Sequence, residues 1–294
     1  MDVASSPSNP QASGEPPSSR MSMTPSLMPP PPEPSFVSKW SDRSLAFFGH
    51  LGVLSSMLVG SIRAGFRRPF EGRAIVKQLE DLGVASCGIV VVTSVFIGMV
   101  MAVQFAFGLQ KFGGLEYVGR VIALSFAREL APTLTAVIVG GRIGSGMAAE
   151  LGAMAVTEQI DAIRALGADP LKKLVWPRLL ASVIVIPIVA AFSLVLGFAG
   201  AMLITDLQFG IPSAFFFRSA LAAVTMTDFA AGMMKTPFFG AIIALVGCHF
   251  GMTTKGGTAG VGNSTTRTVV VISIAILIAD FFLTKLAIII WPQA

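Results

Sequence analysis

The sequence predicts an all-α integral membrane protein, with an N-terminal amphipathic interfacial helix followed by five transmembrane helices. Hydrophobic residues make up 53% of the 294 residues and charged residues only 13%, against about 25% in soluble domains. The mean hydropathy is +0.76. Long uncharged stretches also alternate with short basic connectors. A water-soluble core cannot hold this much apolar surface, so a bilayer is the expected solvent.

The N-terminal segment, residues 1–35, has the composition of a disordered tail. It holds ten prolines and nine serines and few large apolar residues, so it cannot bury a core. It lacks the apolar central region of a secretory signal. Its single arginine makes a plastid transit peptide the less favoured interpretation.

Residues 36–80 predict a helix that lies in the membrane interface. Apolar residues recur at helical spacing on one face, at Phe47, Leu51, Leu54, Leu58 and Ile62. Basic residues follow, at Arg63, Arg67, Arg68, Arg73 and Lys77. This mixture favours an interfacial helix over one packed against the membrane spans. Pro69 should break or kink it.

Residues 81–294 form the predicted transmembrane domain, with spans at residues 82–110, 121–148, 179–205, 236–254 and 268–291. Residues 207–227 are apolar but contain Pro212 and Arg218, which predicts a short helix that re-enters the membrane or lies on its surface. Five spans place 15 of the 21 Lys and Arg residues on one side, whereas a sixth would move Lys255 and Arg267 away from it. The positive-inside rule therefore favours five spans, a cytoplasmic N-terminus and an external C-terminus.

The connector between spans two and three, EQIDAIRALGADPLKKLVWPR (residues 158–178), is a charged island between apolar stretches. Val156, Ile160 and Ile163 form an apolar face, and Gly167 and Pro170 stop the helix. The polar positions are Glu158, Asp161 and Arg164. This pattern predicts a short cytoplasmic helix that docks onto something, because a surface loop would need neither the periodicity nor the defined stop.

The second span carries small residues at four-residue spacing, at Gly140, Gly144, Ala148 and Gly152. Such spacing lets helices approach closely in lipid. A parallel row of small residues beside it predicts contacts with more than one neighbouring helix. Packing within the chain and a homodimer contact both fit this pattern.

Charged residues at membrane depth point to a functional site, because charges are costly there and face a cavity or a partner. Arg128 and Glu129 lie early in the second span, and Lys235 begins the fourth. Lys235 is a candidate partner for Glu129, the alternative being that it snorkels to the interface. Asp280 is expected to pair with a neighbouring helix, and Lys285 to snorkel.

Sequence signatures of catalysis are missing from the chain. It contains no GxxxxGK[ST] phosphate loop, no GxSxG elbow, no HExxH motif and no metal-ligand spacing. If ATP powers transport, a separate chain must hydrolyse it. The net charge of +5 is explained by membrane topology rather than by nucleic-acid binding.

Four segments together resemble the MlaE/YrbE family of ABC-transporter permeases. They are FIGMVMAVQ, ALSFARELAPTLTAVIVGGRIGSGMAAELGAM, TEQIDAIRALGADPLKKLVWPR and TTRTVVVISIAILIADFFLT. The resemblance covers roughly residues 40–292, and the proline-rich tail stands outside it. The block with EQIDAIRALGADP is its most specific part.

The resemblance implies a permease homodimer in the bacterial inner membrane, with a plastid inner envelope less favoured. Two cytoplasmic ATPase subunits would hold ATP and magnesium, this chain binding no cofactor itself. A periplasmic MCE-domain protein and a small STAS-domain protein are further implied partners. The implied substrate is phospholipid or a related lipid, moved to maintain outer-membrane lipid asymmetry or lipid supply.

The resemblance also implies roles for particular residues. The connector would supply the coupling helix that docks onto the ATPase, through Glu158, Gln159, Asp161, Arg164, Gly167, Asp169 and Pro170. The lipid cavity would be lined by Gln104, Arg128, Glu129 and Lys235.

Two other functions stay open. An ion-coupled secondary transporter of hydrophobic substrates would use Glu129, Asp280 and His249, although the sequence shows no inverted repeat of the kind common in such transporters. A non-transporting membrane scaffold would not need charges at membrane depth.

Overall fold

The computed structural model describes residues 36–65 and 72–291. The predicted disordered tail at residues 1–35 and the predicted kink at Pro69 lie outside this part of the chain. Two units are distinguished, residues 1–47 and residues 48–294, and helix α1 (Phe36–Gly65) crosses the boundary between them.

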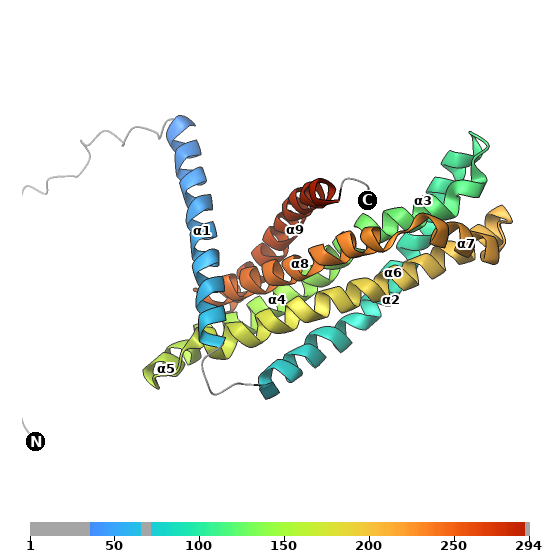
Figure 1. Cartoon of the computed structure of the whole chain (residues 1–294). Helices are drawn as coiled ribbons and strands as arrows, with labels where there is room; N and C mark the ends of the chain where they lie inside the picture. Colours follow the sequence, from blue (N-terminus) through green and yellow to red (C-terminus); the bar gives the residue numbers. More distant parts are fainter. Residues whose placement is uncertain (1–35, 66–71, 292–294) are drawn as a thin grey trace, which may run out of the picture. The chain divides into compact units, whose positions relative to one another are not determined.

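Five helical stretches of the described residues are long and apolar enough to cross a membrane, which confirms the predicted all-α membrane fold (Figure 1). The first is α2 (Gly72–Gln110). The second joins η1 (Leu115–Tyr117), α3 (Val118–Ser125), η2 (Phe126–Leu134) and α4 (Thr135–Val156). The third joins η3 (Leu171–Val175) to α6 (Trp176–Phe209), and the last two are α8 (Met226–Met252) and α9 (Gly257–Ile290).

The helices extend beyond the apolar stretches that reveal them in the sequence. Helix α2 begins at Gly72, so residues 72–80, grouped above with the interfacial segment, continue directly into the first spanning helix. Its first turns carry charged side chains such as Lys77 and Asp81, which are exposed. Backbone hydrogen bonds continue a helix past the bilayer edge, whereas hydropathy marks only the part inside it.

The segment after α6 forms a short helix, α7 (Ser213–Ala223), of 11 residues. It packs on α3, where a Cβ added to Gly119 would lie 2.8 Å from the carbonyl oxygen of Phe216. At ~1.5 Å per residue, α7 is too short to cross the bilayer. The structure therefore supports five spans, with α7 packed against the second.

The small residues of α4 are used in packing against α8 and α9. A Cβ added to Gly140 would lie 2.7 Å from Ile243 of α8, and one added to Gly144 would collide with Ile272 of α9. Ala148 is fully buried, and Gly152 faces Thr254. The prediction of more than one neighbour is confirmed, and both neighbours belong to the same chain.

Helix α9 leaves most of its apolar surface uncovered within one chain. Only 11% of the most apolar 18-residue stretch of α9 is buried, against 56% of the corresponding stretch of α8. Large exposed side chains line it, including Ile274, Leu277 and Phe281. In a membrane protein this surface is available to lipid or to another protein chain.

Candidate functional site

A buried lysine joins three spanning segments. Lys235 of α8 has a side chain that is only 4% exposed. Its ammonium Nζ donates to Glu129 Oε2 at 2.8 Å, to Asp280 Oδ1 at 3.2 Å and to Thr284 Oγ1 at 2.6 Å. The predicted pairings of Lys235 with Glu129 and of Asp280 with a neighbouring helix are confirmed. The alternative, a snorkelling Lys235, is wrong because the side chain is buried among acceptors.

A wide helical turn presents Glu129 to this lysine. Residues 126–134 are π-helical, and Pro132 lies inside the turn. A proline has no backbone N–H, so the regular hydrogen-bond ladder cannot pass through it, and single π-turns are frequent at functional sites. One carbonyl of this turn, that of Arg128, accepts a further hydrogen bond from Lys235 Nζ at 3.2 Å.

Two openings flank the lysine. A cavity of 270 Å³ is lined by Glu129, Asp280, Thr284 and Lys285 together with apolar residues of α9. A smaller one of 50 Å³ is lined by Arg128, Glu129, Lys235 and Thr284, among others. Charged groups and apolar walls thus meet at one place, an arrangement suited to an amphipathic ligand.

Arg128 has a buried partner that the sequence analysis missed. Its Nε donates to Asp228 Oδ1 at 2.6 Å, and its terminal nitrogen forms an ion pair with the same carboxylate. Asp228 is 3% exposed and also closes a capping box with Thr225 at the start of α8. The pattern Thr-x-x-Asp before an apolar stretch was the signal that could have revealed it.

Gln104 lies away from this cluster. It is exposed on α2 and lines neither of the two cavities around Lys235. Within one chain, the structure therefore brings together Arg128, Glu129 and Lys235, and adds Asp228, Asp280 and Thr284. Gln104, the fourth residue expected to line the lipid cavity, lies outside this group.

The connector between the second and third spans contains the predicted short helix, α5 (Gln159–Ala165). Ile160 is buried, whereas Asp161 and Arg164 are exposed and form an ion pair at 2.8 Å. Gly167 ends the helix with φ +76°, a conformation that favours glycine. Glu158 precedes the helix with φ 59°, which is costly for a residue with a side chain.

The turn after α5 is closed by the two remaining residues of the predicted coupling set. Asp169 Oδ1 accepts the backbone N–H of Leu171 at 2.9 Å, and Pro170 begins the next helical segment. Leu166, at the tip of the connector, is 86% exposed. The connector therefore presents a short helix with an exposed polar face and an uncovered leucine.

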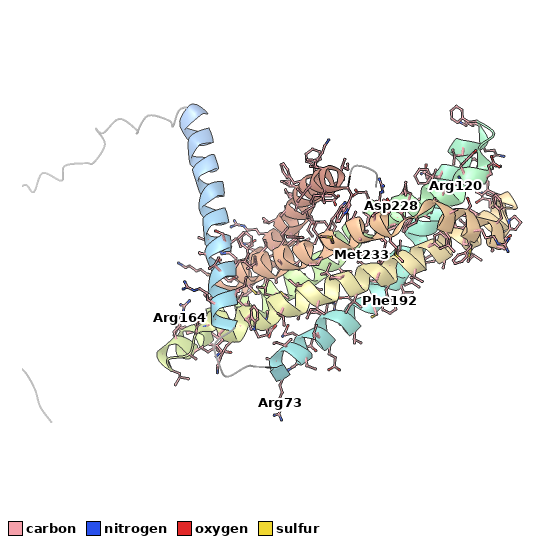
Figure 2. The ribbon with its side chains drawn as sticks, viewed as in Figure 1. Arg73, Arg120, Arg164, Phe192, Asp228 and Met233 are labelled. Atoms are coloured by element: carbon pink, nitrogen blue, oxygen red, sulfur yellow. The ribbon has the colours of Figure 1, made fainter. Side chains whose placement is uncertain are left out.

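Charged residues lie at both ends of the spanning helices. Arg73 and Arg164 lie at the same end, and Arg120 lies at the opposite end (Figure 2). The positive-inside rule predicts that the first two lie on the cytoplasmic side and that the third lies outside. The geometry is that of a multi-pass membrane protein with a charged cluster inside its spans and a helical connector at one end.

Comparison with known proteins identifies the family. Residues 75–286 match the model of the family described as Permease MlaE, and the chain belongs to this family. It is 39% identical over 249 residues to the chloroplastic protein TRIGALACTOSYLDIACYLGLYCEROL 1 of Arabidopsis thaliana, covering 84% of this chain and 70% of the relative. A probable ABC transporter permease of Synechocystis is 40% identical over 251 residues, covering 85% and 92% of the two chains.

A more distant relative carries a similar name. A probable ABC transporter permease of Rickettsia conorii is 34% identical over 244 residues, covering 83% of this chain and 94% of the relative. The family resemblance drawn from the sequence motifs is thus confirmed, as is the prediction that the chain is a membrane permease and not an enzyme.

Proposed function

We propose that this permease moves phospholipid or a related lipid across or out of its membrane, powered by a separate ATPase subunit. The observation that carries the proposal is the Lys235 cluster: a buried cation with two carboxylates, beside an opening that is also lined by apolar side chains of α9. A lipid presents the same combination, a polar head group and apolar tails. The name of the Arabidopsis relative contains a lipid, trigalactosyldiacylglycerol, which supports this substrate class.

The proposed working unit is a homodimer. A cavity of 270 Å³ is small even for a drug-sized ligand, and a phospholipid is larger. The uncovered apolar surface of α9 adjoins this cavity through Leu277, Phe281 and Ile288. Two copies meeting near α9 would enclose a larger cavity, open toward the outer face, with Arg128 and Lys235 near the head group.

The proposed site of energy input is α5. The relatives are named ABC transporter permeases, and such a permease needs an ATP-hydrolysing partner. The exposed face of α5, with Asp161 and Arg164, and the protruding Leu166 suit a groove on that partner. Closure of two ATPase subunits would then push on α5, and the movement would narrow the lipid cavity.

The further partners and the location rest on the family resemblance. We propose a periplasmic MCE-domain protein as donor or acceptor of the lipid, a small STAS-domain protein on the ATPase side, and a bacterial inner membrane with the N-terminus in the cytoplasm. The chloroplastic relative keeps the plastid inner envelope as the second candidate.

ATPase activity of the assembled transporter tests the docking of α5. The variant Arg164→Glu reverses an exposed charge on α5, so we expect lipid-stimulated ATP hydrolysis to fall by about tenfold, because one hydrogen bond to a charged group contributes about 1.5–3 kcal/mol. The matched control is Arg73→Glu, which reverses an exposed charge at the same end of the molecule outside the connector. Unchanged stimulation in Arg164→Glu would show that α5 is not the docking element.

A further inference from the structure

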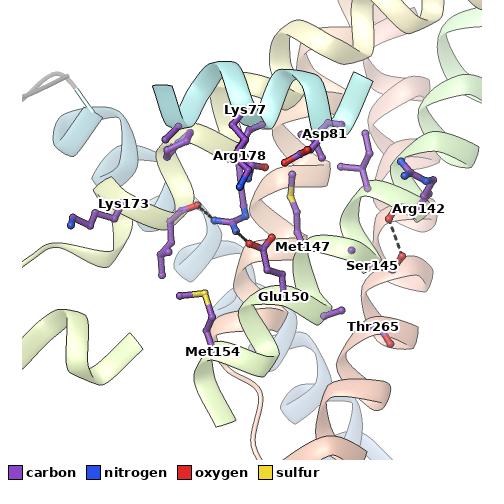
Figure 3. A pocket seen from close by; sticks show the side chains of 18 residues that line it. Lys77, Asp81, Arg142, Ser145, Met147, Glu150, Met154, Lys173, Arg178 and Thr265 are labelled. Carbon is purple, nitrogen blue, oxygen red and sulfur yellow. Dashed lines mark hydrogen bonds and ion pairs between the residues drawn. The ribbon is translucent and has the colours of Figure 1, made fainter. Parts of the chain in front are cut away.

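A second charged cavity lies at the other end of the second span. It measures 910 Å³ and is lined by the first turns of α2, by α4 from Arg142 onward, by η3 and the start of α6, and by Thr265 of α9 (Figure 3). Between Glu129, in the Lys235 cluster, and Glu150, in this cavity, the chain rises about 30 Å. The cavity is therefore separate from the lipid site proposed above. We call it the basic cavity.

Cations outnumber carboxylates in the basic cavity. Lys77, Arg142, Lys173 and Arg178 line it, against Asp81 and Glu150. Arg178 is 5% exposed and already paired, with Glu150 at 2.7 Å and with the carbonyl of Leu174 at 2.7 Å. Among the residues that the structure describes, no carboxylate forms an ion pair with Lys77, Arg142 or Lys173. Three cations and one carboxylate are thus left to face the cavity.

Arg142 is held in position for a ligand. Its terminal nitrogen donates to the hydroxyl of Ser86 at 2.8 Å, and that buried hydroxyl in turn donates to the carbonyl of Leu82 at 2.6 Å. A fixed guanidinium loses less entropy on binding an anion than a free one. One turn further, a Cβ added to Gly146 would meet nothing within 4 Å, so this glycine keeps the wall of the cavity open.

We propose that the basic cavity binds a phosphate group, carried by a phospholipid head group or present as free phosphate. Arginine donates directed, bidentate hydrogen bonds to phosphate oxygens, and lysine attracts them as a point charge. The volume suits a head group, and the exposed apolar side chains of Val76 and Val84 on α2 offer a surface for acyl chains outside the cavity. The predicted topology places this site at the cytoplasmic leaflet.

Calorimetric titration of the full-length chain in neutral detergent tests the site, with dihexanoylphosphatidylglycerol and inorganic phosphate as separate probes. We expect Lys77→Gln combined with Arg142→Gln to weaken binding at this site by about tenfold or more, since each change removes a charged hydrogen bond. Gly146→Leu should also weaken it, by filling the cavity without changing its charge. Lys172→Gln, which removes a neighbouring charge that does not line the cavity, should leave binding unchanged.

The two sources and the two sites are told apart within the same titrations. If equimolar phosphate does not displace the bound lipid, the site is assigned to a lipid head group. If phosphate displaces the lipid, the site is assigned to a small anion. Arg128→Gln should weaken lipid binding only at the Lys235 cluster, because Arg128 lines that site and not the basic cavity. Two results would overturn the proposal. In the first, the affinity for both probes is unchanged in the Lys77/Arg142 variant and in Gly146→Leu. In the second, the affinity falls equally in Lys172→Gln.

Discussion

Lys235 and Glu129 are 106 positions apart in the chain, yet the lysine Nζ donates to the glutamate Oε2 at 2.8 Å. This contact ties the third turn of α8 to the π-helical turn before α4, and Asp280 ties both to α9. Three spanning segments therefore share one lysine, which makes Lys235 the central residue of the candidate site.

Replacing Lys235 tests how much the cluster contributes to stability. Lys235→Met should lower the free energy of unfolding by about 2 kcal/mol, less than the 3–5 kcal/mol of a fully buried pair because Glu129 is 40% exposed and can be rehydrated. Thermal unfolding in detergent measures the change. Adding Glu129→Gln should restore part of the loss, since it removes one of the carboxylates left without a cation.

The matched control for this prediction is Lys285→Met in α9. Lys285 is exposed and forms no ion pair within the described part of the chain. An equal effect of Lys235→Met and Lys285→Met would contradict the central position given to Lys235.

Asp228 is predicted to stabilise the chain through two roles at once. Asp228→Ala removes the capping box at the start of α8 and the partner of Arg128, so it should cost about 2 kcal/mol. Asp206→Ala is the control, because Asp206 is exposed and accepts one hydrogen bond from Ser213. The same thermal unfolding assay compares them, and equal midpoints would refute the assignment.

Replacement by leucine should have opposite effects at two glycines of α4 that are only two residues apart. Gly144→Leu should destabilise by about 3 kcal/mol, because even a Cβ at this position collides with Ile272. Gly146→Leu should be neutral or stabilising, since nothing lies within 4 Å of its Cβ and leucine is the better helix former. If Gly144→Leu keeps full stability and loses only self-association, this small-residue row serves a dimer contact instead of packing within the chain.

The left-handed conformation of Glu158 predicts a backbone effect at the start of α5. Glu158→Gly should raise the free energy of unfolding by up to about 1 kcal/mol, because glycine adopts φ 59° without the cost of a Cβ. Glu158→Val should lower it by about 1–2 kcal/mol, since a branched side chain suits this region least. Chemical denaturation of the two variants measures the difference, and the reverse order of stability would be inconsistent with the described turn.

Much of the fold was predictable because hydropathy and small-residue spacing act locally. The five spans, the helix stop at Gly167 and the intimate packing of Gly140 and Gly144 all follow from residues close in sequence. The starts of the helices were less predictable, as Gly72 illustrates, because nothing in hydropathy marks a helix that continues into water.

The site was predictable only in part because its contacts join distant segments. Charge at membrane depth singled out Arg128, Glu129, Lys235 and Asp280. The pairing of Lys235 with Glu129 could be predicted from the sequence alone. Asp228 was missed because it lies at a span boundary, where a carboxylate is unremarkable. The basic cavity was missed because its cations lie on four separate segments, α2, α4, η3 and α6, and each of them looks like an ordinary positive-inside signal.

The structure also weakens one of the alternatives drawn from the sequence. A proton pathway through Glu129, Asp280 and His249 needs these groups within reach of one another. His249 lies fourteen residues after Lys235 on α8, so the rise along the helix separates it from the cluster by about 20 Å. Glu129 and Asp280 instead share Lys235.

ATP-driven lipid movement in reconstituted vesicles tests the proposed function most directly. The permease and its ATPase partner are reconstituted together, and transfer of a fluorescent phospholipid to acceptor vesicles is followed with and without ATP. We expect transfer to require ATP hydrolysis and to be abolished by Lys235→Met, while Lys111→Met, at an exposed lysine that lines none of these cavities, retains it. Transfer that proceeds without the ATPase under an imposed pH gradient, or that is indifferent to Lys235, would contradict the account.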